Sequence, residues 1–130
     1  MKLDHIGIAV ADLTQAARFY EELGLRVTGR EELPGEGVRV AFLPLDEGRI
    51  ELLESVDPEG PIGRFLARRG PGLHHVSLKV SDLEAALAAL AAKGYDLIDR
   101  RPRRGAGGHK VAFVHPKATG GVLLELSEES

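Results

Sequence analysis

Cysteine and tryptophan are absent from this chain of 130 residues, and methionine occurs once. Without cysteine the protein forms no disulfide and performs no thiolate chemistry, so nitrogen and oxygen atoms must hold any metal that it binds. No apolar run in the sequence is long enough to span a bilayer. The net charge of −3 argues against a general nucleic-acid binder, whose surface would be clearly basic. We therefore expect neither nucleic acid nor a membrane as a partner.

The composition is typical of a globular protein, since 28% of the residues are charged and 43% are hydrophobic. A chain of this length is sufficient for one compact domain with a sizeable core, and we expect a single domain over residues 1–130. The first residues lead directly into a strand-like pattern and do not resemble a signal peptide. The expected location is the cytoplasm.

A repeated pattern divides the chain into two copies of one unit. Residues 3–13 and residues 73–83 are alike, with His5 and His75 at the same place in each. Gly94 follows Gly24 at the same offset as His75 follows His5, so the repeat continues without a gap to that point. An internal repeat relates equivalent residues by a pseudo-two-fold axis, so two histidines at matching strand starts can converge on one metal ion.

Each copy is predicted to have the element order β-α-β-β-β. Period-two alternation indicates the first strand, and an Asp N-cap and a terminal Gly bound the helix that follows. In the first copy we expect strands over residues 3–10, 25–30, 37–45 and 49–55 and a helix over 13–23. In the second copy we expect strands over 73–80, 95–100, 109–115 and 121–127 and a helix that ends at Gly94.

The predicted fold class is α+β, built from two βαβββ modules. Module one covers about residues 1–56 and module two about residues 72–128. The intervening stretch, about residues 61–69, has apolar residues at helical spacing before a Gly-Pro-Gly break, which predicts a short linker helix.

Both copies end in a strand with one carboxylate between aliphatic residues, Glu51 in the first and Glu125 in the second. A strand alternates, so either carboxylate alone would be expected to face water, and a lone His5 would be an ordinary strand histidine. The joint occurrence of His and Glu in both copies favours a metal site instead, because a buried carboxylate needs a compensating cation. His5, Glu51, His75 and Glu125 suit a divalent metal such as Co²⁺, Mn²⁺, Ni²⁺ or Zn²⁺.

The repeat and the His, Glu, His, Glu order resemble the vicinal-oxygen-chelate superfamily. Within it, the chain resembles the methylmalonyl-CoA epimerases over nearly its whole length. The first histidine motif is shared by the whole superfamily, whereas His115-Pro116-Lys117 in residues 107–117, followed by residues 120–126, is the more specific signal. The related glyoxalase I enzymes usually have a different turn there, and one histidine where this chain has His74-His75.

The resemblance implies that the two modules line a U-shaped mixed sheet around one divalent metal ion per chain, Co²⁺ before Mn²⁺, Ni²⁺ or Zn²⁺. It implies the ligands His5, Glu51, His75 and Glu125. It also implies a homodimer, a small-molecule acyl-CoA substrate and a place in propionate metabolism. Some epimerases carry a glutamate at the position of Val40, proposed as one of two proton-transfer bases, and valine cannot do that work.

Epimerisation of (2R)- and (2S)-methylmalonyl-CoA requires removal of a proton next to the thioester and its return on the opposite face. A divalent metal would stabilise the enolate as a Lewis acid. With Val40 excluded, the repeat offers Glu51 and Glu125 as the two bases, at equivalent places in the two copies.

Other residues have alternative interpretations. Gly107, Gly108, His115 and Lys117 form either an ordinary loop or contacts with the thioester and the CoA arm. The cluster Arg100, Arg101, Arg103 and Arg104 is either a solvated face or a binding site for CoA phosphates. His74 is offset by one from His75, so we expect it to point away from the metal site.

Three other functions remain open at this point. Glyoxalase I would use the same ligands on a glutathione hemithioacetal. A metal-free resistance protein would sequester a drug with the same fold, but such proteins generally lose ligands. Ring-cleaving dioxygenases of the superfamily use two histidines and one carboxylate, so a fourth ligand at Glu51 counts against them.

Overall fold

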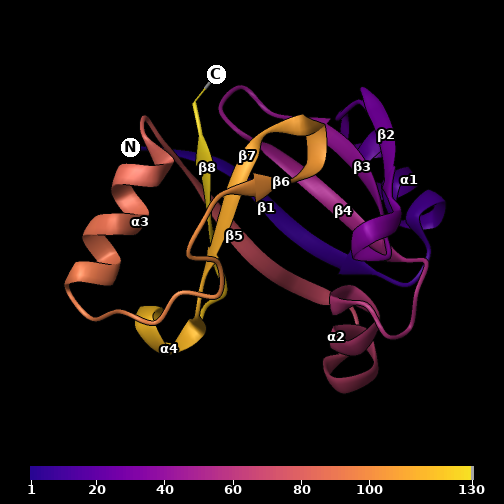
Figure 1. Ribbon diagram of the computed structural model, residues 1–130. Helices are drawn as coiled ribbons and strands as arrows, with labels where there is room; N and C mark the ends of the chain where they lie inside the picture. Colours follow the sequence, from indigo (N-terminus) through magenta and orange to yellow (C-terminus); the bar gives the residue numbers. More distant parts are fainter. Residues whose placement is uncertain (130) are drawn as a thin grey trace. The chain divides into compact units, whose positions relative to one another are not determined.

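The computed structural model describes residues 1–129, and Figure 1 follows the chain from indigo to yellow. The first copy of the repeat has four strands and one helix. In chain order they are β1 (Lys2–Val10), α1 (Leu13–Leu23), β2 (Gly29–Leu33), β3 (Val38–Pro44) and β4 (Arg49–Ser55), with the 3₁₀ turn η1 (Pro34–Glu36) between β2 and β3. The predicted linker helix is present as α2 (Pro61–Arg69).

The second copy has the same order with short additions near its end. It consists of β5 (Gly72–Val80), α3 (Leu83–Ala92), β6 (Arg103–Arg104), η2 (Ala106–Gly108), β7 (Lys110–Val114), α4 (Pro116–Thr119) and β8 (Leu124–Glu128). None of the helices in residues 1–129 is long and apolar enough to cross a membrane.

Equivalent strands pair in the same way in both copies. β1 pairs with β4 in parallel and β5 with β8 in parallel, while β3–β4, β2–β3, β7–β8 and β6–β7 are antiparallel. The eight strands follow the order β2-β3-β4-β1-β5-β8-β7-β6 in one mixed sheet. The α+β class and the doubled βαβββ pattern predicted from the sequence are thereby confirmed.

The repeat extends to the helix starts. The Asp12 side chain accepts the Gln15 N–H at the start of α1, and the Asp82 side chain accepts the Ala85 N–H at the start of α3. Glu54 and Glu128, each at the far end of its copy, accept the first N–H of these helices from Leu13 and Leu83. Each copy therefore ties its helix to its own last strand, and an N-cap contributes about 1 kcal/mol.

The strand predicted over residues 95–100 is wrong. In this segment only Leu97 forms an isolated bridge, with Val114, and the short edge strand β6 lies farther along, at Arg103–Arg104. The reason lies in the hydrogen bonds to Phe113. The Asp99 side chain accepts the Phe113 N–H, and the Ile98 and Asp99 N–H groups share the Phe113 carbonyl. A side chain and a shared acceptor replace the regular ladder of hydrogen bonds.

The strand predicted over residues 25–30 begins only at Gly29. Leu25 and Val27 have the apolar alternation of a strand, but their side chains instead pack against the hydrophobic core of the first copy. Apolar spacing predicted their burial but not their hydrogen bonding.

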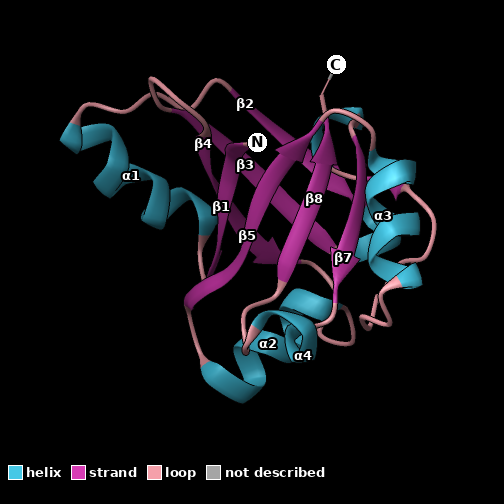
Figure 2. Cartoon of the chain, turned by 90° about the vertical axis from the view of Figure 1, so that its left-hand side faces the viewer, coloured by secondary structure: helices cyan, strands magenta, loops and turns pink. Residues whose placement is uncertain are grey.

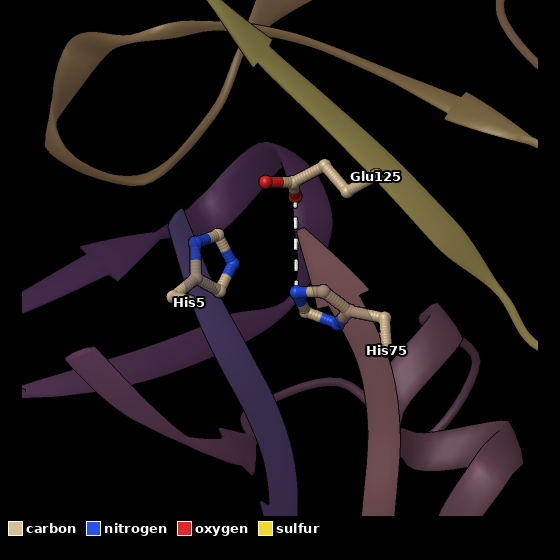
Figure 3. Close-up of side chains that lie close together, drawn as sticks. All are labelled: His5, His75 and Glu125. Carbon is tan, nitrogen blue, oxygen red and sulfur yellow. Dashed lines mark ion pairs between the residues drawn. The ribbon is translucent and has the colours of Figure 1, made fainter. Parts of the chain in front are cut away.

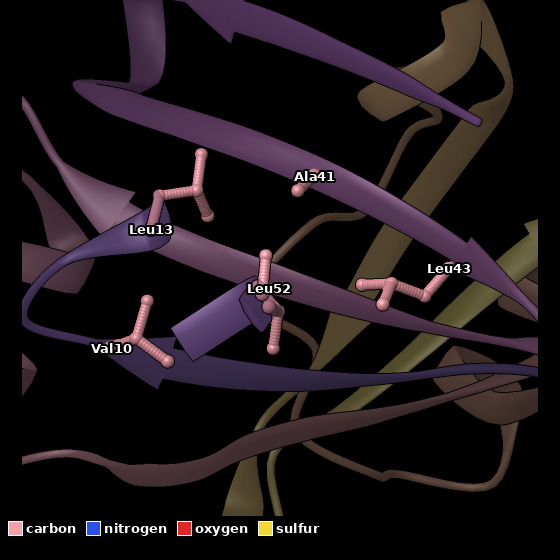
Figure 4. Packing of buried hydrophobic residues seen from close by; sticks show 6 residues of the cluster. Val10, Leu13, Ala41, Leu43 and Leu52 are labelled. Carbon is pink, nitrogen blue, oxygen red and sulfur yellow. The ribbon is translucent and has the colours of Figure 1, made fainter. Parts of the chain in front are cut away.

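Contacts divide the chain into two compact units: residues 5–74, and residues 1–4 with 75–130. In the first unit, α1 packs on β3 and β4 over a core of small and medium aliphatic side chains (Figure 4): Val10, Leu13, Ala17, Ala41, Leu43 and Leu52. In the second unit, α3 lies beside β7 and β8 (Figure 2) over an equivalent core: Val80, Leu83, Leu87, Ala112, Val114 and Leu126. The module boundaries predicted from the sequence remain a prediction.

Candidate metal centre

The first half of the candidate site is built by β1 and β4. In the parallel register His5 lies opposite Arg49 and Gly7 opposite Glu51, which places the three polar side chains on neighbouring strands. His5 and Glu51 are 3% and 2% exposed, so the interpretation that Glu51 faces water is wrong. The His5 Nδ1 atom lies 3.4 Å from the Glu51 Oε2 atom.

Arg49 is a charged neighbour of this pair that was not among the predicted site residues. Its Nε and Nη2 atoms lie 2.8 and 2.7 Å from the same oxygen, Oε2 of Glu51. Nη2 is also 3.5 Å from Nδ1 of His5, and the guanidinium carbon lies 5.9 Å from the centre of the Phe42 ring. Alternation places residues 49 and 51 on one face of β4, and this was the signal in the sequence that could have identified Arg49.

The second half is built by β5 and β8. Glu125 lies opposite Ser77 in the parallel register, and the Ser77 hydroxyl donates a 2.7 Å hydrogen bond to its Oε2 atom. The Glu125 Oε1 atom lies 3.8 Å from Nε2 of His75. The edge of the His75 ring meets the Phe113 ring, at 5.6 Å between centres. Burial of Glu125, His75 and Ser77, at 6%, 5% and 0% exposure, excludes the solvent-facing interpretation of Glu125 as well.

Three of the predicted ligands form one group. His5, His75 and Glu125 each offer one ligand atom, and the three atoms lie within 4.8 Å of one another (Figure 3). Glu51, the fourth predicted ligand, contacts His5 and Arg49. Its role as a metal ligand remains a prediction.

The group suits a divalent metal. Metal distances to imidazole nitrogen and carboxylate oxygen are about 2.0–2.2 Å, so two ligand atoms of one ion are at most about 4.4 Å apart. The 3.8 Å between His75 and Glu125 meets that limit, and the 4.8 Å bound exceeds it only slightly. Two imidazoles and a carboxylate, all buried, are a typical donor set for Co²⁺, Mn²⁺, Ni²⁺ or Zn²⁺.

His74 lies on the opposite side of its strand from His75, as predicted. Its ring meets the Phe65 ring of α2 edge-on, at 5.0 Å between centres. Burial lowers the pKa of His74 to about 4, so its ring is neutral at physiological pH. His74 is thus a partly buried histidine packed against Phe65.

The structure gives some of the predicted substrate residues local roles. The His115 Nδ1 atom accepts the Lys117 N–H and caps α4, so this segment is a short helix and not an ordinary loop. Gly107 and Gly108 have φ near +75°, and a Cβ on Gly107 would lie 3.1 Å from the His109 ring. Contacts of these four residues with a substrate remain a prediction.

The arginine cluster borders a surface pocket of about 670 Å³ beside α3. Arg103 is distinct within the cluster: it pairs with Asp99, and its guanidinium lies 5.2 Å from the centre of the Phe113 ring, which in turn contacts His75. Binding of CoA phosphates by this cluster remains a prediction. Val40 is buried on β3, and as a valine it offers no carboxylate at that position.

Comparisons with known proteins agree with this geometry. The sequence profile of the "Glyoxalase/Bleomycin resistance protein/Dioxygenase superfamily" matches residues 4–113. A Bacillus subtilis protein, "Uncharacterized protein YqjC", is 43% identical over 98% of this chain and 91% of its own length. Human mitochondrial methylmalonyl-CoA epimerase is 39% identical over 98% of this chain and 73% of its own length.

A solved structure of a variant of Streptomyces coelicolor methylmalonyl-CoA epimerase, in complex with 2-nitronate-propionyl-CoA, is also similar to this chain. It superposes with a TM-score of 0.96 at 34% identity, over the whole of this chain and 95% of the other. The resemblance to the superfamily that the motifs indicated is confirmed.

Proposed function

We propose that this chain, which belongs to the glyoxalase/bleomycin resistance protein/dioxygenase superfamily, is a metal-dependent epimerase that interconverts (2R)- and (2S)-methylmalonyl-CoA. The observation that carries the proposal is the buried group of His5, His75 and Glu125 in a chain 39% identical to a methylmalonyl-CoA epimerase. Fold alone would not choose among the chemistries of the superfamily.

His5, His75 and Glu125 would hold the metal. When bound, a divalent metal supplies a Lewis acid that stabilises negative charge on substrate oxygens. The protein has to supply the rest: a buried surrounding that excludes water, and groups that remove and return the proton.

Glu125 is the better supported of the two proposed bases. Its Oε2 atom is held by a neutral hydroxyl, and its Oε1 atom is the one that approaches His75. Glu51 is held by a guanidinium, which leaves its carboxylate less able to move. We therefore propose Glu125 as the principal base, which would have to leave the metal to take up the proton, and retain Glu51 as the candidate for the second face.

Proton NMR of methylmalonyl-CoA in D₂O with the Co²⁺-loaded protein tests the function. The α-hydrogen should exchange with solvent, and each pure enantiomer should become a mixture of the two. In a parallel assay, the glutathione adduct of methylglyoxal should react far more slowly. A fast reaction of that adduct, with no deuterium in methylmalonyl-CoA, would assign the protein to glyoxalase chemistry instead.

A further inference from the structure

The two copies of the repeat differ in the chain that follows their helices. The first copy continues to β2, a strand of five residues that pairs along its whole length with β3. The second copy reaches β6, of only two residues, after a stretch over residues 93–102 that forms just the isolated bridge at Leu97. The end of this stretch and β6 line the pocket of about 670 Å³ beside α3. The pocket therefore lies where the second copy departs from the repeat.

The side of α3 that lines this pocket has small side chains. Ala88 and Ala91 of α3 stand at the repeat positions of Arg18 and Glu21 of α1. With Pro102, the two alanines give the pocket an apolar part of its lining. Its volume is within the range of about 300–1,000 Å³ that is typical of small-molecule sites. The pocket therefore has room for an organic ligand.

The polar lining of the pocket is basic. One carboxylate, that of Glu84, is set against five cationic side chains, which are Arg100, Arg101, Arg103, Arg104 and Lys110. The chain as a whole has a net charge of −3, so the pocket has the opposite sign. Clustered like charges raise the local concentration of counter-ions, and the pocket therefore attracts anions.

Two of the arginines have their donors available for a ligand. Among the described residues, 1–129, the side chains of Arg100 and Arg101 form no hydrogen bond or ion pair. Arg103, in contrast, pairs with Asp99. A guanidinium donates two parallel N–H bonds to a phosphate group. Two available guanidinium groups therefore suit a ligand with two phosphate groups.

The pocket and His75 lie on opposite faces of β7. Lys110 lines the pocket, and two residues on, Ala112 packs with Leu87 of α3 in the core of the second unit. Phe113 faces the other way, and its ring contacts the ring of His75. Since alternate residues of a strand face opposite sides of a sheet, β7 separates a ligand in the pocket from the metal ligand His75.

We propose that this pocket binds a nucleoside diphosphate at a site separate from the metal centre. Arg100 and Arg101 hold the diphosphate, and the apolar lining receives the base. The cluster then serves a free nucleotide in place of the CoA phosphates predicted from the sequence. The proposal does not depend on the epimerase function.

Calorimetric titration with ADP, in the absence of added metal ion, tests the site. The parent protein should bind one ADP per chain, and adenosine, which lacks the phosphate groups, should not bind. The double variant Arg100→Gln/Arg101→Gln should bind ADP about tenfold more weakly or worse, because it loses charge-assisted hydrogen bonds to both phosphate groups. If ADP does not bind to the parent at millimolar concentration, the proposal is wrong.

The double variant Arg64→Gln/Arg68→Gln is the matched control. It removes the same charge from two exposed arginines of α2, neither of which lines the pocket. Its affinity for ADP should equal that of the parent. Equal losses in the two double variants would indicate a general attraction between an anion and a basic surface, and would overturn the proposed site.

Propionyl-CoA distinguishes a free nucleotide from the substrate, because coenzyme A contains an adenosine diphosphate unit of its own. The affinity of Arg100→Gln/Arg101→Gln for propionyl-CoA should remain within about threefold of the parental value, since loss of one or more charged hydrogen bonds would cost about tenfold. A loss that matches the loss for ADP would assign the pocket to the acyl-CoA and overturn a separate site. ADP can bind whether or not deuterium enters methylmalonyl-CoA, so the two proposals are tested separately.

Discussion

The hydroxyl of Ser77 on β5 donates a hydrogen bond of 2.7 Å to Oε2 of Glu125 on β8, and both residues are buried. The pairing of β5 with β8 places them directly opposite each other. Such a partner fixes which oxygen of a ligating carboxylate is presented to a metal, and its loss typically lowers metal affinity by 10–100-fold.

The first prediction therefore concerns Ser77→Ala. We expect Co²⁺ affinity to fall by about tenfold or more, because Glu125 loses the group that orients it. Calorimetric titration of the apo protein measures this. Ser81→Ala is the control: Ser81 is exposed and directly follows β5, so the Co²⁺ affinity of this variant should equal that of the parent. Equal affinity in the two variants would remove Ser77 from the metal centre.

The second prediction concerns the histidine ligands. His5→Ala and His75→Ala should each retain much less than one Co²⁺ per chain after dialysis, measured by elemental analysis. The adjacent His74 supplies the control, because its ring contacts Phe65, and His74→Gln should retain full occupancy. Full metal content in either alanine variant would exclude that histidine as a ligand.

The third prediction concerns proton transfer. Glu125→Gln should lower the rate of inversion a hundredfold or more, because a carbonyl oxygen can still bind a metal but cannot carry a proton. If Glu51 serves the other face, one enantiomer will still exchange its α-hydrogen through it without inverting. Proton NMR of each enantiomer in D₂O separates exchange from inversion.

The same experiment on Glu51→Gln tests the assignment of Glu51 as the second base. Under the two-base hypothesis the variant should lose inversion and retain exchange of the opposite enantiomer. Inversion at the parental rate in Glu51→Gln would leave Glu51 with a structural role only, and the second base would have to be sought elsewhere.

The fourth prediction concerns stability at acid pH. Burial lowers the pKa of His74 to about 4 from its ordinary 6.5. Between these two pH values the histidine is protonated in the unfolded chain but neutral in the native protein. The native state should lose stability as the pH falls from 6.5 towards 4, by on the order of 3 kcal/mol from this residue. Above pH 6.5 this residue has no effect of that kind.

Denaturant unfolding of His74→Phe and of the parent at a series of pH values measures the contribution. The variant should show a smaller loss of stability between pH 6.5 and pH 4, because phenylalanine has no proton to gain. Parallel pH profiles for the two proteins would contradict a lowered pKa of the partly buried ring at position 74.

Much of this protein can be predicted from its sequence because the repeat is explicit. An Asp cap predicted the start of the first helix and the repeat predicted the second helix, and the side chains of Asp12 and Asp82 do accept the capping N–H groups. Equivalent histidines and glutamates predicted a metal site, and His5, His75 and Glu125 do form a group. These features follow from local spacing and from symmetry between the copies, which are both properties of the sequence.

Tertiary structure decided what depends on contacts between distant side chains. Asp99 accepts the Phe113 N–H and so interrupts a strand that the apolar pattern of residues 95–100 favoured. His5 meets Glu51 and Arg49 because the parallel pairing of β1 with β4 brings the two strands together. A sequence shows that an arginine stands two residues before a glutamate, but a flexible side chain has many rotamers. Only the packed neighbours select the one in which its guanidinium contacts Glu51.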